Sequence, residues 1–249
     1  LNCKHCRAEI LKPMIPAGRP NDFETLVRRM IDRQGLRGFL LSGGSNLRNE
    51  VPFEPYLPVV EKLKADFPGL RVLVHTGLVD GRRARALAAA GADVAMLDII
   101  GDAATIRDVY HLRRPVADFE DSLAKLVAAG LNVVPHVVVG LHFGRILGES
   151  RALEIIARHK TEAAIIVVLT PAFADPGFGA IDLAEAMAIL AEARRLLGDR
   201  KLLLGCARPP GAARVTLDVA ALLAVFDGVA YPADEAVRMA RMIGRAHDH

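Results

Sequence analysis

Seven short apolar runs, each followed by a segment with helical spacing, constrain the fold of this chain more than any other feature. The runs expected to form strands are residues 38–41, 71–75, 93–98, 132–139, 163–169, 201–204 and 228–230. The segments expected to form the helices after them are residues 56–67, 82–90, 118–129, 150–159, 183–197, 217–226 and 233–243. Near-continuous apolar strands are typical of a parallel sheet that is buried on both faces. The pattern predicts an α/β fold, and no linker interrupts it, so we expect a single domain over residues 1–249.

A further expected helix, from Asn21 or Asp22 to Gly35, precedes the first run. A strand before Leu1 would complete eight strand–helix units, and a start at leucine instead of methionine suggests that a preceding segment is missing. We therefore predict a (β/α)8 barrel of the TIM type whose first strand lies before Leu1. An open doubly wound sheet is the structural alternative. In a barrel of this type the chemistry lies at the carboxyl ends of the strands.

Composition sets limits on location and partners. The formal net charge is only +3 over 249 residues, which gives no argument for nucleic acid or an anionic membrane surface. No apolar run approaches the roughly 18 residues of a membrane-spanning helix. The chain has 3 cysteines, an odd number, and a core of this size does not need disulfides. We therefore expect a cytoplasmic protein whose thiols serve as ligands or nucleophiles.

Two of the three cysteines lie in the first six residues, as Cys3-Lys4-His5-Cys6. A Cys-x-x-Cys pair has several chemical interpretations. It can be half of a zinc site, which His5 or Cys206 would complete, or a thioredoxin-like redox pair. It can also be part of an iron–sulfur loop, because soft thiolate sulfur donates strongly to iron.

The pair resembles the last two cysteines of the Cys-x3-Cys-x2-Cys loop of the radical SAM superfamily. The resemblance implies a first cysteine two positions before Leu1, and a 4Fe-4S cluster held by Cys3 and Cys6 whose open iron binds S-adenosylmethionine. The loop Ser42-Gly43-Gly44-Ser45 is similar to the family's Gly-Gly-Glu loop, whose backbone binds the methionine amino group. Ser45 stands here in place of the glutamate.

The middle of the chain also resembles this family, in its biotin synthase-like branch. Asp98 and Arg114 would flank the substrate, and His136-Val137-Val138-Val139-Gly140 is similar to the Gly-x-Ile-x-Gly-x-x-Glu strand that contacts adenine. Val138 and Gly140 match this strand, whereas His136 and Phe143 replace its first glycine and its glutamate. His75, at the end of a strand, is a further candidate for cofactor binding. From the residues alone, Asp98 and Arg114 could equally form an ion pair, and His136 could be a packed histidine.

The end of the chain narrows the resemblance to the archaeal-type two-component lipoyl synthase group. The stretches that carry it are residues 3–11, 205–209 and 228–232. The resemblance implies radical insertion of sulfur into an octanoyl chain, carried by a protein or a small molecule, with an electron donor and a second radical SAM partner. Cys206 and Arg208 would be catalytic residues, as ligands of a possible auxiliary iron–sulfur cluster. A buried, inert Cys206 is the alternative.

Two other functions remain open at this point. The first is a different radical SAM reaction on a small molecule or cofactor precursor, and the second is a metal- or ligand-binding barrel without radical chemistry. The apolar side chains that could line an acyl channel under the first interpretation are those of Ile99, Ile100, Val138 and Leu169.

Overall fold

The computed structural model describes residues 3–244 and contains the expected seven strands. They are β1 (Gly38–Leu41), β2 (Arg71–His75), β3 (Val94–Asp98), β4 (Asn132–Val139), β5 (Ala163–Val168), β6 (Lys201–Leu204) and β7 (Gly228–Val229). In the sheet they follow one another in chain order. This arrangement confirms an α/β fold of the TIM type.

Helices follow the strands, as the sequence pattern predicts. They are α1 (Pro20–Gln34), α2 (Leu57–Asp66), α3 (Gly81–Ala89), α4 (Ala103–Asp108), α5 (Ala117–Ala128), α6 (Glu149–Ala157), α7 (Leu183–Leu197), α8 (Ala212–Leu223) and α9 (Asp234–Met242). Three 3-10 turns are added to them: η1 (Glu9–Leu11), η2 (Glu54–Tyr56) and η3 (Pro171–Phe173). No helix within residues 3–244 is both long enough and apolar enough to cross a membrane.

The described chain divides into two compact units. The first contains residues 8–97 and 117–134, and the second contains residues 3–7, 98–116 and 135–244. The Cys-x-x-Cys segment therefore belongs to the second unit, although α1, which follows it in sequence, belongs to the first.

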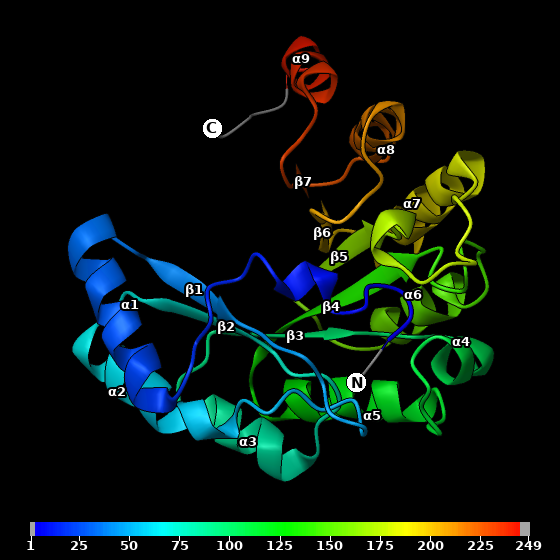
Figure 1. Cartoon of the computed structure of the whole chain (residues 1–249). Coiled ribbons are helices and arrows are strands. Elements are labelled where there is room, and N and C mark those ends of the chain that lie inside the picture. The colour runs from blue at the N-terminus through cyan, green and yellow to red at the C-terminus, as the bar shows by residue number, and fades with distance from the viewer. Residues whose placement is uncertain (1–2, 245–249) are drawn as a thin grey trace. The chain divides into compact units, whose positions relative to one another are not determined.

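In the first unit, β1, β2 and β3 pair in parallel, with Leu41 opposite Val74 and Val74 opposite Ala95. Helices α1, α2, α3 and α5 pack in succession against one another (Figure 1). Pro20 begins α1, where its missing N–H is not needed, and Phe23 is buried on the inner face of that helix. The cap differs from the expected Asn21 or Asp22, because the helix begins after Arg19, whose backbone N–H donates to the Asp22 carboxylate.

In the second unit, β4 to β7 pair in parallel and α6 to α9 pack in succession (Figure 1). Alternate residues of these strands are fully buried, as expected for the face that the helices cover. The residues between them are half-buried and form one row across the opposite face: His136, Val138, Ile165, Val167 and Leu203.

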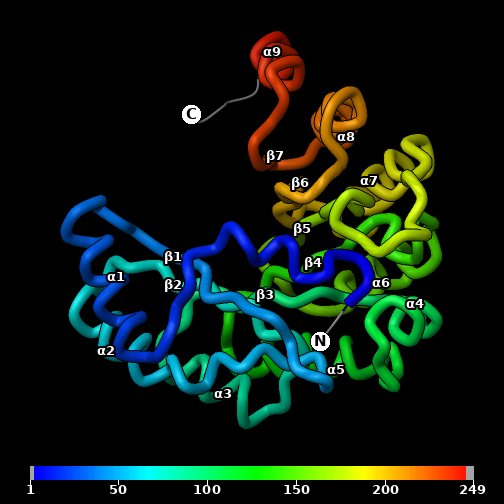
Figure 2. The backbone as a smooth tube through the Cα atoms, in the orientation of Figure 1, coloured from blue at the N-terminus to red at the C-terminus, as the bar shows by residue number. Residues whose placement is uncertain are grey.

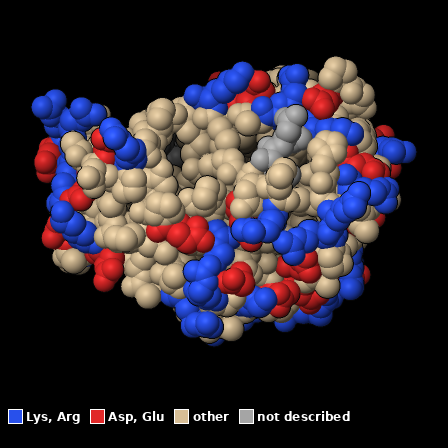
Figure 3. Space-filling view, turned by 60° about the horizontal axis from the view of Figure 1, so that its bottom comes forward, with Lys and Arg blue, Asp and Glu red and all other residues tan. Residues whose placement is uncertain are grey.

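The surface carries both signs of charge. On the face drawn in Figure 3, acidic side chains lie among the basic ones over most of the charged area. This mixture agrees with the small net charge and with the absence of an electrostatic argument for nucleic acid.

Candidate functional site

The Cys-x-x-Cys segment of the second unit is fixed by backbone hydrogen bonds to two distant parts of the chain. It is the dark blue start of the tube in Figure 2. The N–H of Lys4 donates to the Val109 carbonyl at 3.0 Å, and the Lys4 carbonyl accepts from the N–H of Asp175 at 2.8 Å. The guanidinium of Arg7 lies 3.7 Å from the Asp175 carboxylate. A loop held in this way can present two thiols in a fixed arrangement.

Protein atoms surround Cys3 closely, and only 9% of its surface is exposed. Burial is the largest cause that raises the pKa of the Cys3 thiol to about 12, and the neighbouring Cys6 and Asp98 contribute to the same shift. Part of the Asp98 surface is exposed to solvent. Many protein atoms nevertheless lie close to its carboxyl group, and the resulting loss of hydration raises the pKa of Asp98 to about 6. The Cys3 thiol and the Asp98 carboxyl therefore ionise less readily here than in water, an effect that a cationic occupant such as iron would oppose.

Tyr110 lies against this group. Its ring centroid is 4.9 Å from that of His5, and only 3% of its surface is exposed. Burial raises the pKa of the Tyr110 hydroxyl, and Asp98, Cys3 and Cys6 raise it further. The hydroxyl has no partner in full hydrogen-bond geometry within the described chain, although Asp98 lies close enough to interact with it as a weak, poorly aligned acceptor. Sequence reasoning did not find this residue.

His5 completes the surroundings of the thiols. Burial lowers its pKa to about 4, so its ring is neutral at physiological pH, and its buried Nδ1 has no hydrogen-bond partner in residues 3–244. Two polar atoms without partners, on Tyr110 and His5, thus border the thiols. Because buried polar groups are almost always paired, such atoms indicate a missing ligand.

The described residues do not complete a zinc site around Cys3 and Cys6. Among residues 3–244, no three His, Cys, Asp or Glu side chains are grouped as a metal site. The structure therefore does not bring His5 or Cys206 together with Cys3 and Cys6 as a zinc site would require. Cys3 and Cys6, on one fixed loop, are two soft sulfur ligands of the kind that iron–sulfur clusters use.

In the first unit, the loop Ser42-Gly43-Gly44-Ser45 directly follows β1. The hydroxyl of Ser42 and Nδ1 of His75, at the end of β2, are 2.9 Å apart. Burial lowers the pKa of His75 to about 4, so the imidazole is neutral and one of the two groups can donate to the other. The two predicted residues therefore meet, and their hydrogen bond holds the start of the loop.

Gly43 and Gly44 are not required by the fold. Neither has a positive φ, and an added Cβ would meet nothing closer than 3.9 Å at either position. Space beside two successive glycines is what a ligand needs if it is to approach the backbone closely. The loop is thus compatible with the predicted contact to the methionine group.

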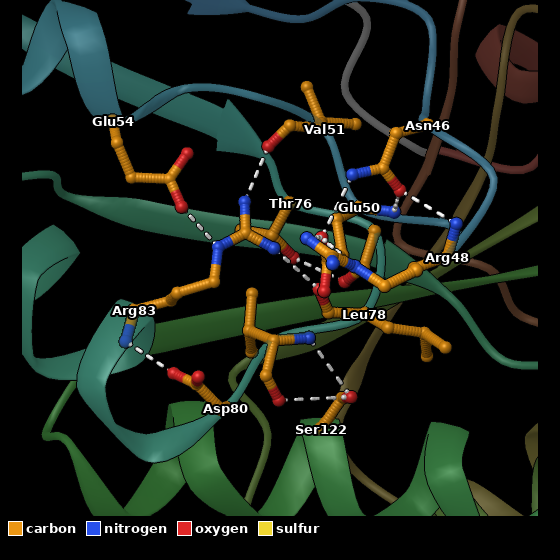
Figure 4. A network of polar contacts seen from close by, with 12 residues as sticks. Asn46, Arg48, Glu50, Val51, Glu54, Thr76, Leu78, Asp80, Arg83 and Ser122 are labelled. Atoms are coloured by element: carbon orange, nitrogen blue, oxygen red, sulfur yellow. Dashed lines mark hydrogen bonds and ion pairs between the residues drawn. The ribbon is translucent and has the colours of Figure 1, made fainter.

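The far end of the same loop is fixed by a network around Arg83 (Figure 4). The Arg83 guanidinium is buried, donates to the carboxylate of Glu54 and to the carbonyl of Val51, and lies 4.7 Å from the ring centroid of Phe53. Its backbone N–H donates to Asp80, which caps α3. The segment after Gly44 is therefore tied to the start of α3, so the loop is held at both ends.

Strand β4 and the residue directly after it contain three of the predicted residues. His136 and Val138 are half-buried on one face of β4, and Gly140 ends the strand with φ +79°. A Cβ on Gly140 would lie 2.7 Å from Ile181, so the fold itself requires this glycine. The matched motif therefore has a structural cause at this position.

Glu149 is a residue of this loop that sequence reasoning missed. Its buried carboxylate accepts from the N–H groups of Gly140, Leu147 and Gly148, at 2.8, 2.8 and 2.9 Å. The family motif has its glutamate at the position of Phe143, where the ring instead lies 5.5 Å below the ammonium of Lys4. A carboxylate thus supports the loop from a different position in the sequence.

The structure gives no support to Arg208 as a catalytic residue. The guanidinium is 3% exposed and forms a two-point ion pair with Asp218. Its nitrogens also donate to the carbonyls of Gly205, Ala230 and Tyr231. Every guanidinium nitrogen therefore has a protein acceptor, and we do not carry the predicted role of Arg208 further.

Cys206 is exposed, which is against the alternative of a buried, inert thiol. It belongs to no group of metal-binding side chains in the described chain. Arg114 lies in the segment of the chain that joins α4 to α5, and its side chain is half-buried.

The expected acyl channel is not formed by the side chains named for it. Ile99, Ile100 and Leu169 are at most 3% exposed and belong to the core of the second unit. Beside Ile99, Ile100 and Val138 lies a cavity of about 10 Å³, which has room for about one water molecule. An alkyl chain would need another path.

Comparisons with known proteins give a likeness of fold. No protein-family model and no curated protein matches the chain. Among solved structures, the FeFe-hydrogenase maturase HydG matches 92% of this chain with 16% identity and a TM-score of 0.65. The chain spans only about half of that protein, since 53% of HydG is covered.

Two further structures match a similar share of the chain. Methylornithine synthase (PylB) matches 99% of this chain and 79% of its own, with 14% identity and a TM-score of 0.63. The HMG-CoA lyase from Brucella melitensis matches 94% of this chain and 86% of its own, with 15% identity and a TM-score of 0.56. At such identities the likeness shows the fold alone: a TIM-type α/β fold that is also found in these enzymes.

Proposed function

We propose that this protein is a radical SAM enzyme. The observation that carries the proposal is the fixed loop that presents Cys3 and Cys6, bordered by two buried polar atoms, the Tyr110 hydroxyl and Nδ1 of His5, that have no partner in hydrogen-bond geometry within residues 3–244. HydG and PylB, whose fold the chain shares, are radical SAM enzymes. Their similar fold supports the proposal but is not sufficient for it, because the HMG-CoA lyase, a different enzyme, has a similar fold too.

Each part of the chain has a definite task under this proposal. In the second unit, Cys3 and Cys6 bind the 4Fe-4S cluster and the loop that ends β4 at Gly140 accepts the adenine. In the first unit, the open backbone at Gly43 and Gly44 is the candidate contact for the methionine part of S-adenosylmethionine. A cluster held by Cys3 and Cys6 would supply the one-electron chemistry needed for reductive cleavage of S-adenosylmethionine and for removal of a hydrogen atom from the substrate. The protein positions these groups and excludes water.

The finer proposal is insertion of sulfur into an octanoyl chain in lipoate synthesis. The resemblance of residues 3–11, 205–209 and 228–232 supports it. Because Arg208 is engaged with Asp218, we propose that the inserted sulfur comes from a partner, a second radical SAM protein that carries an iron–sulfur cluster. The exposed thiol of Cys206 remains a candidate contact with that partner or with an auxiliary cluster.

The test is cleavage of S-adenosylmethionine. The anaerobically reconstituted full-length protein with dithionite is expected to form 5′-deoxyadenosine and methionine in equal amounts. The variants Cys3→Ala and Cys6→Ala are expected to form none, whereas Cys206→Ala still does.

An octanoyl-protein acceptor and the partner are then added. Sulfur transfer supports the lipoyl function, and 5′-deoxyadenosine without sulfur transfer favours another radical SAM reaction. Wild-type protein that binds iron and sulfide but cleaves no S-adenosylmethionine would contradict the proposal.

A further inference from the structure

The hydroxyl of Tyr110 is buried without a hydrogen-bond partner in the described chain. A buried hydroxyl in this state has lost its hydration and gained nothing in return. Phenylalanine would fill the same space without that cost. The working protein is therefore expected to supply an acceptor for this hydroxyl, and the cysteine loop is a neighbouring element that could hold one.

Three contacts place Tyr110 against that loop. The N–H of Lys4, between the two cysteines, donates to the carbonyl of Val109 at 3.0 Å, and Val109 directly precedes Tyr110. The rings of His5 and Tyr110 lie 4.9 Å apart. Cys3 and Cys6 both act electrostatically on the hydroxyl. All of these residues belong to the second unit, so their arrangement does not depend on the first.

We propose that the Tyr110 hydroxyl donates a hydrogen bond to a cysteine sulfur of the bound cluster and thereby raises the reduction potential of that cluster. This inference rests on the proposed function. One-electron reduction, by a donor such as dithionite, adds one negative charge to the cluster and its sulfurs. A hydrogen bond to these sulfurs is then stronger in the reduced state than in the oxidised state, so it favours reduction.

Asp98 is the rival acceptor, because its carboxylate also acts on the Tyr110 hydroxyl. The two possibilities have different consequences. A bond to Asp98 would stabilise the protein without the cluster and would leave the potential almost unchanged. A bond to a cluster sulfur would shift the potential and would contribute nothing to the protein without iron.

The experiment uses the full-length protein with its cluster reconstituted anaerobically. Wild type, Tyr110→Phe and Tyr231→Phe are titrated with dithionite in the presence of redox mediators, and the reduced cluster is measured by electron paramagnetic resonance. At the wild-type midpoint potential, Tyr110→Phe is expected to lower the ratio of reduced to oxidised cluster about three- to tenfold, the effect of one hydrogen bond. Tyr231→Phe makes the same chemical change at an exposed position and is expected to match wild type.

A second measurement guards against a purely structural effect. Without iron, Tyr110→Phe is expected to unfold at the same or a higher urea concentration than wild type, because it loses only an unpaired hydroxyl. Equal potentials with normal iron content, or a less stable iron-free variant, would overturn the inference and leave the proposed function intact. Failure of wild type to assemble any cluster would instead contradict the proposed function, and the inference would fall with it.

Discussion

Two kinds of glycine occur in the loops of this chain, and only the structure distinguishes them. Gly77 has φ +60°, and a Cβ there would lie 2.2 Å from the carbonyl oxygen of Asn49. Gly43 has neither feature. Sequence reasoning could place both in loops, but it could not tell a glycine that the fold needs from one that leaves room for a ligand.

Gly43→Ala is therefore expected to leave stability almost unchanged and to weaken binding of S-adenosylmethionine by about tenfold, since a methyl group would stand where the ligand approaches the backbone. Equilibrium dialysis on the reconstituted protein measures the affinity, and thermal unfolding measures the stability. Gly77→Ala serves as the control. It is expected to lose at least about 2 kcal/mol of stability, because it combines a left-handed backbone with a steric clash. Unchanged affinity in Gly43→Ala would remove the loop from the binding site.

His75 makes the free energy of unfolding depend on pH, and the direction of this dependence follows from its lowered pKa. Its pKa is lowered by burial from 6.5 to about 4, so between these values the unfolded chain takes up a proton that the folded chain refuses. Stability is therefore fully present above pH 6.5 and falls as the pH drops toward 4. Relative to His75→Gln, wild type is expected to lose about 1 to 2 kcal/mol between pH 7 and pH 4.5.

Urea unfolding of both proteins at several pH values measures this difference, and the other titrating groups cancel in the comparison. A constant difference in unfolding free energy across the range would show that His75 is protonated equally easily in both states. The glutamine variant keeps a hydrogen-bonding group near Ser42, so it tests the charge rather than the contact.

At the scale of elements, the packing of β6, α8 and β7 around Arg208 explains why the sequence suggested a catalytic role for this residue. Arg208 follows a strand end two residues after Cys206, which is where a barrel places its chemistry. Nothing in the sequence shows that Asp218, one turn and more into α8, reaches back to it. The two side chains form a buried ion pair, and Asp218 also accepts from the N–H of Ala233.

Removal of one partner should leave a buried charge uncompensated. Arg208→Met is expected to destabilise the protein by about 3 to 5 kcal/mol without lowering the iron content of the folded fraction. Arg238→Met is the matched control, because Arg238 forms an exposed ion pair with Glu235 and should cost less than about 1 kcal/mol. Chemical denaturation and iron analysis of the folded protein give the two readouts. A stable Arg208→Met protein that has lost iron would restore Arg208 as a ligand.

The elements that sequence reasoning missed are short or lack a periodic signal. Helix α4 has only six residues, Ala103–Asp108, too few for a helical pattern to stand out. Helix α8 begins at Ala212, five residues before the expected start, because its first turn has no apolar stripe that marks it. Glu149 was missed because its role depends on three backbone N–H groups that only the folded loop brings together.

At the scale of the whole molecule, the alternation of apolar runs and helical segments was enough to predict the fold. All seven expected strands are present, four of them with the expected bounds, because β-branched and leucine-rich runs between glycines have few alternatives. The candidate site was predicted in part. The Cys-x-x-Cys pair and the Ser42–His75 contact follow from strand ends, whereas Tyr110 lies in no motif and is identified only by its burial.

The central claim is that Cys3 and Cys6 bind a 4Fe-4S cluster, and iron and sulfide analysis with electron paramagnetic resonance tests it most directly. Full-length wild type and Cys206→Ala, reconstituted anaerobically, are expected to hold about four irons and four sulfides and to give a signal after reduction. Cys3→Ala and Cys6→Ala are expected to lose both. Wild type that binds zinc or no metal at all, or Cys3→Ala and Cys6→Ala variants with full iron content, would contradict the account.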